Sequence, residues 1–200
     1  MRKAIIHLKS SDPILASIIE RVGPYRMTYR EPGFATLVRS IVFQQLNGRA
    51  ATKIFDRLVE ATGGQLTAEA LLNMSDAQYR KAGISPQKLR YLRDLAARTA
   101  SGEIDFTKLP ELSDSEVIEH LTRVTGVGNW TAQMFLMFAL RRTNIMPVND
   151  LGIQMAIRRH YRKRKLPNPK HILKLARNWE PYCSVACWYL WRSMDGQIEL

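Results

Sequence analysis

Apolar residues recur three or four positions apart along almost the whole chain, whereas strict alternation of polar and apolar residues is scarce. Side chains three or four apart share a face in a helix, and alternate residues share a face in a strand. The pattern therefore predicts an all-α fold. Helices are expected at 13–21, 34–44, 49–62, 68–74, 76–82, 86–100, 114–123, 130–141, 151–161, 170–178 and 183–193.

The chain carries no low-complexity linker, long disordered run or clear internal repeat that would divide it. We expect one unit spanning 1–200, a compact bundle of two-lobed form, with 103–111 as a non-helical connection. Residues 5–8 are open to two interpretations, a short strand or an extended arm. Ser85 followed by Pro86, and Ser113 followed by Glu116, are typical of helix starts.

The charge balance favours a polyanionic partner. Thirty Lys and Arg face 18 Asp and Glu, which gives a net charge of +12 and a pI near 10.0. Nucleic acid is the first candidate, because phosphate neutralisation releases counterions, and a membrane surface is the second. No apolar run reaches the roughly 20 residues that a spanning helix needs, and residues 1–10 are unlike a signal peptide. We expect a soluble, non-secreted protein.

The two cysteines, Cys183 and Cys187, are four apart in an apolar helical segment. A disulfide within a regular helix is geometrically awkward, and a metal or iron–sulfur site normally needs more than two cysteines. We therefore interpret both as buried thiols.

The turn Gly126-Val127-Gly128 joins two helical patterns. Glycines let a backbone turn tightly and approach another molecule closely. The second glycine leads directly into a helix, whose unpaired N–H groups and positive dipole end can hold a phosphate oxygen without reading base sequence. The alternative is an ordinary helix stop followed by a helix start.

This turn is part of one of four ordered motifs. They are Ser40-Ile41-Val42-Phe43-Gln44-Gln45-Leu46, Gly126-Val127-Gly128-Asn129-Trp130-Thr131-Ala132, Pro147-Val148-Asn149-Asp150-Leu151-Gly152 and Trp179-Glu180-Pro181-Tyr182-Cys183-Ser184-Val185-Ala186. Over nearly its whole length the chain resembles the helix-hairpin-helix DNA glycosylase superfamily, and within it the DNA-3-methyladenine glycosylase II group. The resemblance implies base excision repair of alkylated purines, with the hairpin at about 121–140. The N-terminal β-domain of larger relatives is expected to be absent.

The resemblance assigns catalysis to Asp150. Asp150 begins a predicted helix, where the dipole favours a carboxylate. Breaking a nucleoside C–N bond develops positive charge on the sugar, which a carboxylate can stabilise while it orients or deprotonates water. The alternative is a plain N-cap worth roughly 1 kcal/mol, and one residue can serve both purposes.

The resemblance also bears on mechanism and on the pocket. Trp130 stands two residues after Gly128, where bifunctional relatives carry a Schiff-base lysine, so the resemblance implies a monofunctional enzyme that uses water. Trp130 and Trp191 match pocket-wall positions that can stack on a cationic purine, and Met134 lies one turn further along. The alternative for Trp191 and Met134 is core packing.

In the turn after residue 43, the resemblance implies a loop inserted into the minor groove. Gln45 would read neighbouring bases, and either Leu46 or Asn47 would fill the space of the flipped base. The alternative is that Gln44 and Gln45 only bridge neighbouring helices. The carbonyls of Thr122, Val124 and Val127 match places where the family can hold a structural Na⁺ or K⁺. No catalytic metal or other cofactor is implied.

Three points stay open at the level of sequence. Cys183 stands where relatives often carry Arg. The basic run 158–165 can flank DNA, serve as a localisation patch or be a solvated face. Two other functions compete with the first, a non-catalytic DNA-binding module and a glycosylase for deaminated or oxidised bases. We expect a monomer bound to double-stranded DNA and no membrane, in the cytoplasm and nucleoid of a prokaryote or the nucleus of a eukaryote.

Overall fold

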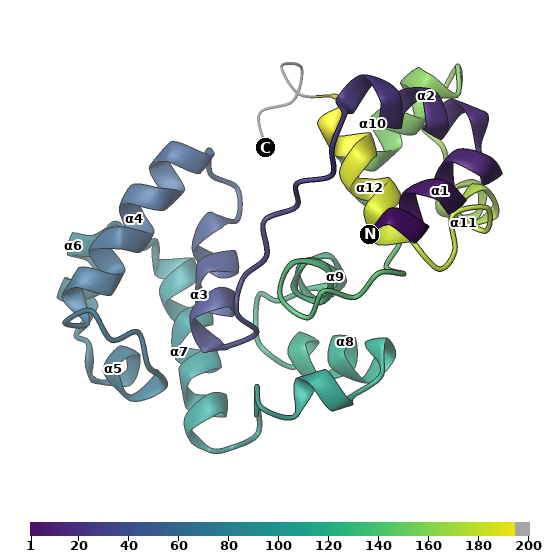
Figure 1. Ribbon diagram of the computed structural model, residues 1–200. Coiled ribbons are helices and arrows are strands. Elements are labelled where there is room, and N and C mark those ends of the chain that lie inside the picture. Colours follow the sequence, from purple (N-terminus) through teal and green to yellow (C-terminus); the bar gives the residue numbers. More distant parts are fainter. Residues whose placement is uncertain (195–200) are drawn as a thin grey trace. The chain divides into compact units, whose positions relative to one another are not determined.

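The computed structural model describes residues 1–194, which form α-helices and one 3₁₀ helix and contain no strand (Figure 1). The all-α prediction is confirmed. The elements are α1 (Arg2–Ser11), α2 (Pro13–Val22), α3 (Phe34–Phe43), α4 (Gly48–Ala61), α5 (Ala68–Asn73), α6 (Asp76–Ala82), α7 (Pro86–Ala100), η1 (Leu109–Glu111), α8 (Asp114–Thr122), α9 (Asn129–Phe138), α10 (Leu151–His160), α11 (Pro169–Ala176) and α12 (Cys183–Arg192).

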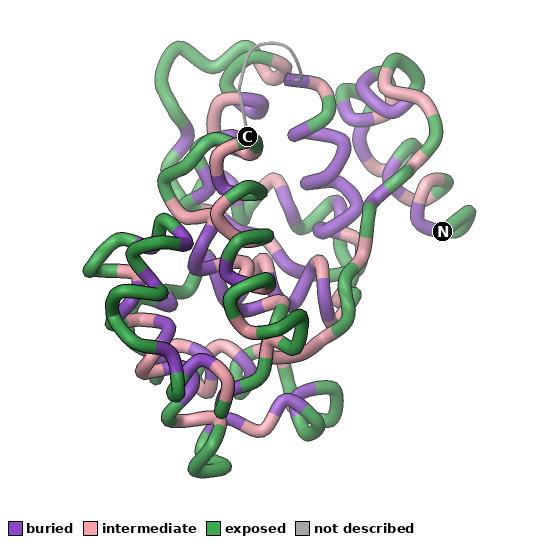
Figure 2. The backbone as a smooth tube through the Cα atoms, turned by 90° about the vertical axis from the view of Figure 1, so that its left-hand side faces the viewer, coloured by how far each residue is buried: buried purple, intermediate pink, exposed green. Residues whose placement is uncertain are grey.

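The contacts divide the described chain into two compact units. The terminal unit comprises residues 1–29 and 141–194, and the central unit comprises Arg30–Leu140. In most helices of both units buried and exposed positions alternate along the turns, as Figure 2 shows. Within the described residues no helix is both long enough and apolar enough to span a bilayer.

The terminal unit is organised around α12, whose residues from Cys183 to Trp191 are all buried. Helices α2 and α10 pack against it. Asp12 joins the first part of the unit to the last, since its Oδ1 accepts from the amides at the start of α2 and its Oδ2 accepts from Tyr161 Oη and, at 2.9 Å, from Trp179 Nε1. This buried carboxylate is therefore fully engaged in holding the unit together.

The prediction of a short strand or an extended arm at residues 5–8 is wrong, because these residues lie inside α1. Ala4 and Leu8 are buried and four apart, so they face the same side of the helix, where α1 packs against α2. The β-branched pair Ile5-Ile6 suggested a strand, and tertiary packing overrides that weak local preference.

The central unit contains α3 to α9. Helix α7 packs against α3, α5 and α6, and α9 packs against α8 and α3. Two predicted helix starts are confirmed. Ser85 accepts a hydrogen bond from the Lys88 amide, and Ser113 and Glu116 form a capping box. Helix α9 ends three residues before its predicted end, because the amides of Ala139 and Leu140 both return to the Phe135 carbonyl.

The cysteine prediction is confirmed, since both thiols are buried and neither is in a disulfide. Burial raises the pKa of Cys183 to about 12, and burial raises the pKa of Cys187 as well. Cys183 Sγ lies 3.6 Å from the Ala176 carbonyl oxygen at the end of α11. Both thiols therefore act as small core side chains and not as nucleophiles.

Candidate functional site

The terminal unit holds a buried carboxylate at the start of α10. Asp150 is the N-cap of this helix and is 7% exposed. Its Oδ1 accepts the Ile153 amide at 2.8 Å and Trp191 Nε1 at 2.9 Å. Two N–H donors and the positive end of the helix dipole thus surround the carboxylate with positive partial charge.

Gly152 lets the Trp191 indole approach this carboxylate. A Cβ atom at residue 152 would lie 3.1 Å from Asp150 Oδ1, 3.1 Å from Trp191 Cδ1 and 3.3 Å from Trp191 Nε1. Trp191 is 8% exposed, and its indole passes over the space that a side chain would take. A side chain at this motif position would therefore require the carboxylate and the indole to shift by a few tenths of an ångström.

The predicted pocket residues are distributed over both units. Asp150 and Trp191 are brought together in the terminal unit, as described above. Trp130 and Met134 lie in the central unit, four apart on α9, so they share one face of that helix. Trp130 is 48% exposed, which is unusual for so large an apolar side chain, and Met134 is half-buried.

The hairpin turn between α8 and α9 lies in the central unit. Gly126 has φ +83°, and a Cβ there would lie 2.2 Å from Tyr91 Cδ2, so only glycine fits. Val127 is buried and anchors the turn, while Gly126 and Gly128 are exposed. Gly128 is the N-cap of α9 and makes no side-chain cap hydrogen bond, and the positive end of the helix dipole at this point favours an anion.

Two side chains from other elements brace this turn. Gln44 Nε2 donates to the Gly126 carbonyl at 3.0 Å, and the Asp94 carboxylate accepts the Thr125 amide at 2.7 Å. Burial alone would raise the pKa of Asp94, but hydrogen bonds from Thr125 and the neighbouring Arg98 lower it overall. These two contacts therefore connect the hairpin to the α3 loop and to α7.

The loop after α3 is fixed at its base and exposed at its tip. Lys88 Nζ donates to the carbonyls of Val42 at 2.6 Å and Gln44 at 2.8 Å, which satisfies the end of α3. Gln45 follows with φ +57°, and Leu46 is 38% exposed. Gln44 thus forms a bridging contact to the hairpin, while Gln45 stays exposed.

Asn47 has a local structural role. Its Oδ1 accepts the Ala50 amide at 2.9 Å and so caps α4. Leu46, in contrast, is an exposed apolar side chain beside it. The sequence left these two residues as equal candidates for the wedge, and of the two Asn47 is the one engaged in a helix cap.

Helix α7 supplies bracing residues that the sequence analysis missed. Lys88, Tyr91, Asp94 and Arg98 lie three or four apart and so follow one face of the helix. Lys88 contacts the α3 loop, Tyr91 and Asp94 contact the hairpin, and Arg98 pairs with Asp94. In the sequence, polar side chains three or four apart on the predicted helix 86–100 were the signal that this helix could hydrogen-bond to the backbone of neighbouring loops.

The carbonyl set predicted to hold a monovalent cation lies at the end of α8. Thr122 is the last residue of that helix, where intrahelical N–H donors run out, and the Val124 carbonyl accepts the Val127 amide at 3.0 Å. Neutral carbonyl oxygens suit a weakly bound Na⁺ or K⁺ more than a transition metal. Among residues 1–194, no group of three His, Cys, Asp or Glu is placed to hold a metal ion.

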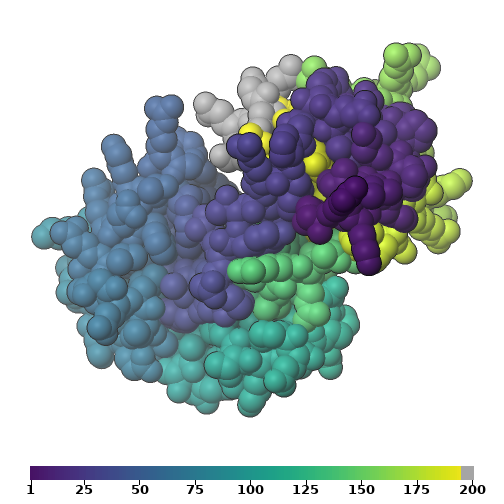
Figure 3. Space-filling model, in the orientation of Figure 1, coloured from purple at the N-terminus to yellow at the C-terminus, as the bar shows by residue number. Residues whose placement is uncertain are grey.

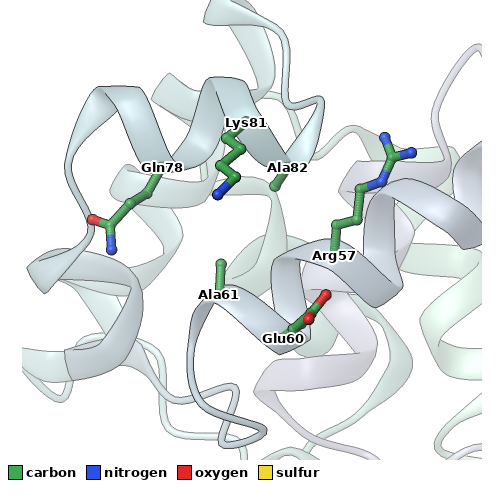
Figure 4. A pocket seen from close by; sticks show the side chains of 6 residues that line it. All are labelled: Arg57, Glu60, Ala61, Gln78, Lys81 and Ala82. Atoms are coloured by element: carbon green, nitrogen blue, oxygen red, sulfur yellow. The ribbon is translucent and has the colours of Figure 1, made fainter.

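A separate hollow in the central unit does not resemble an active site. It has a volume of about 440 Å³ and lies between α4 and α6. Figure 4 shows the Lys81 side chain extending from α6 toward Ala61 on α4. None of the predicted site residues lines it; its walls are Arg57, Glu60, Ala61, Gln78, Lys81 and Ala82.

The comparisons with known proteins now identify the family. Residues 38–181 match the model of the HhH-GPD superfamily base excision DNA repair proteins. The chain therefore belongs to this superfamily of base excision DNA repair proteins.

Individual relatives cover the chain almost completely. DNA-3-methyladenine glycosylase 1 of Schizosaccharomyces pombe is 36% identical over 96% of this chain and 87% of its own. The crystal structure of a DNA-3-methyladenine glycosidase from Bacillus halodurans superposes with a TM-score of 0.87, at 36% identity over 96% of this chain and 89% of that one. The S. pombe 3-methyladenine DNA glycosylase in complex with abasic DNA gives a TM-score of 0.86, at 36% identity over 96% of each chain.

Proposed function

We propose that this chain is a DNA N-glycosylase that hydrolyses the N-glycosidic bond of alkylated purines, of the 3-methyladenine and 7-methylguanine type, and leaves an abasic site. The observation that carries the proposal is the buried carboxylate of Asp150, held by Ile153 N–H and Trp191 Nε1. A phosphate-binding module alone gains nothing from a buried anion held in this way. The names of the relatives, which are 3-methyladenine glycosylases, support the substrate class.

The chemistry follows from the charge of the substrate. Alkylation at N3 or N7 makes the purine cationic, so it leaves with the bonding electron pair and needs little acid assistance. The sugar then carries an oxocarbenium-like positive charge, which the Asp150 carboxylate stabilises. Water adds to C1′, and its proton passes to the carboxylate or to solvent. A carboxylate fixed by two hydrogen bonds needs no reorganisation as this charge develops.

The reaction is proposed to stop at the abasic site. Coupled strand cleavage requires an amine nucleophile that forms a Schiff base. At the position two residues after Gly128 this chain has Trp130 and not lysine. The indole instead offers an exposed aromatic face, which favours a cationic purine by stacking and cation–π attraction worth about 0.5 to 2 kcal/mol.

Duplex DNA would be bound at the hairpin and at the loop after α3. The exposed Gly126 and Gly128 permit close approach of a phosphate to the first turn of α9, with Val127 as the buried anchor between them. Leu46 is the proposed wedge, since an apolar side chain can occupy the gap left by a flipped base. Gln45, exposed and in a left-handed conformation, lies beside it at the loop tip.

A monovalent cation and a monomeric state complete the proposal. Na⁺ or K⁺ would be held by the carbonyls of Thr122, Val124 and Val127, where it would add positive charge next to the bound phosphate. No step of the hydrolysis is assigned to it. A single chain carries every residue with a proposed role in the reaction, so the reaction needs no second copy.

The test is release of 3-methyladenine and 7-methylguanine from methylated duplex DNA, with Asp150→Asn measured beside the wild type. The substitution keeps the size of the side chain and an oxygen for the cap but removes the negative charge. We expect at least a 100-fold lower release rate, with strands intact until alkali treatment. Binding of undamaged DNA without release of either base would instead support a non-catalytic module, or a glycosylase for other lesions if another damaged base is released.

A further inference from the structure

Nearly all of the net positive charge of the described residues lies in one unit. Within the described residues, the terminal unit has 17 Lys and Arg against 4 Asp and Glu, whereas the central unit has 13 against 12. The hairpin and the loop with Leu46, the two DNA contacts of the proposed function, both belong to the nearly neutral central unit. The excess charge of the terminal unit therefore calls for a separate explanation.

The densest part of this charge lies in the segment between α10 and α11, which we call the basic loop (residues 162–168). In Figure 3 this segment, light green on the colour bar, projects from the surface of its unit. Lys163, Arg164 and Lys165 are all exposed. With Leu166, Pro167, Asn168 and His171 they line an open hollow of about 670 Å³.

The shape of the basic loop is defined by its backbone. Arg162 adopts φ +51°, and the Lys163 amide returns to the Arg158 carbonyl at 2.8 Å, which closes the end of α10. Pro167 is buried, and Asn168 caps α11 through the His171 amide at 2.9 Å. The cationic side chains are thus presented between two fixed helix ends.

No acidic residue in the described part of the chain pairs with these side chains. Within residues 1–194, none of Lys163, Arg164 and Lys165 forms an ion pair. Of the four acids in the described part of the terminal unit, Asp12 and Asp150 are buried in hydrogen-bond networks, and Glu20 pairs with Lys9 at 2.8 Å. The fourth, Glu180, is exposed and forms no ion pair with the basic loop. The hollow between α4 and α6 differs in this respect, because its Arg57 and Lys81 share their surroundings with Glu60.

We propose that the basic loop is a second phosphate-binding surface for duplex DNA, which acts independently of base identity and of damage. This inference rests on the proposed function and extends it to a part of the chain with no role in the chemistry. Three adjacent unpaired cations around an open hollow match a polyphosphate backbone, which binds by counterion release. A membrane surface fits less well, because Leu166 is the only large apolar side chain in the loop.

The test compares two triple variants with the same loss of charge. Lys163→Gln, Arg164→Gln and Lys165→Gln together remove the basic loop's charge, and Arg57→Gln, Arg80→Gln and Lys81→Gln remove three exposed charges from the central unit. The dissociation constant for undamaged and for methylated duplexes is measured between about 50 and 300 mM salt, the range over which counterion release changes affinity strongly. Release of 3-methyladenine is measured at saturating enzyme in single turnover.

We expect the loop variant to bind both duplexes at least tenfold more weakly at low salt. The slope of log affinity against log salt should fall by about 2 to 3, because each lost phosphate contact is worth about 0.9. The control variant should change affinity less than twofold, and the saturated release rate of both variants should stay within twofold of wild type. If the wild type releases no base, the proposed function fails, but the affinity comparison still decides the role of the loop.

Two outcomes would overturn the inference. One is a loop variant whose affinity and salt slope equal those of the wild type or of the control. The other is a loop variant that keeps its duplex affinity but no longer sediments with phosphatidylserine vesicles that the wild type binds, which would assign the loop to a membrane surface.

Discussion

Trp191→Phe separates two roles that this side chain can have in the carboxylate site. As a hydrogen-bond donor, Trp191 Nε1 holds Asp150 Oδ1 at 2.9 Å; as a pocket wall, it needs only an aromatic face. Phenylalanine keeps an aromatic ring and removes the N–H. A hydrogen bond to a charged group contributes about 1.5 to 3 kcal/mol. If that contribution is needed to hold the carboxylate in the transition state, the rate falls by about 10- to 150-fold.

The assay is single-turnover release of 3-methyladenine at saturating enzyme, together with thermal unfolding of each variant. Trp188→Phe is the matched control, since Trp188 lies on the same helix, is equally buried at 8% exposed and packs on Tyr25 with ring centroids 4.8 Å apart. Both variants lose the same volume from α12, so a shared effect reports packing alone. A Trp191→Phe enzyme that folds and retains more than half of the wild-type rate would refute the donor role.

Three further outcomes follow from the hairpin and its neighbours. Gly126→Ala should weaken DNA binding at least tenfold, because its Cβ would collide with Tyr91. The control Gly64→Ala has a similar φ of +84° with nothing within 4 Å of its Cβ, so it should only lower the unfolding temperature slightly. Equal DNA affinity in both variants would exclude the steric argument. The fold lowers the pKa of Asp94, so the stability that this carboxylate contributes is present above its unfolded pKa and is lost as pH falls through its folded pKa. The difference in melting temperature between wild type and Asp94→Asn should therefore shrink below about pH 4. A constant difference down to about pH 2 would count against the Thr125 contact. Leu46→Ala should slow base release and leave stability unchanged. Asn47→Ala should lower the free energy of unfolding by about 1 kcal/mol through the lost cap and should affect base release less. The reverse pattern would make Asn47 the wedge.

Sequence periodicity was sufficient for most of the fold because most of these helices have a buried face and a local start signal. Ser85, Ser113 and Asp150 all act as the N-caps that their positions suggested. Helix α1 was missed because its signal is only two buried residues, Ala4 and Leu8, among β-branched and polar neighbours. Its stability comes from packing on α2, which no local pattern contains.

The sequence predicted the site residues that lie within one motif, but it did not predict the contacts between residues far apart in the chain. Asp150 and Gly152 lie in one motif, but the bond from Trp191 joins residues 41 apart. The braces at Gly126 and Thr125 likewise come from Gln44 and Asp94, at separations of 82 and 31 residues. Such contacts depend on which helix faces pack together, so they appear only in the folded chain.

The distribution of charge then follows from how each unit would hold DNA. A hairpin that binds phosphate through backbone amides and a helix dipole needs no Lys or Arg, so the central unit can remain nearly neutral and keep its ion pairs, such as Arg98 with Asp94. Phosphate binding by backbone amides of the hairpin releases few counterions, because the central unit carries little net charge. Most of the salt dependence of binding should consequently come from the terminal unit. The fall in the salt slope of the basic-loop variant therefore measures how much of that dependence comes from Lys163, Arg164 and Lys165, and the slope that remains reports the other cations of the protein.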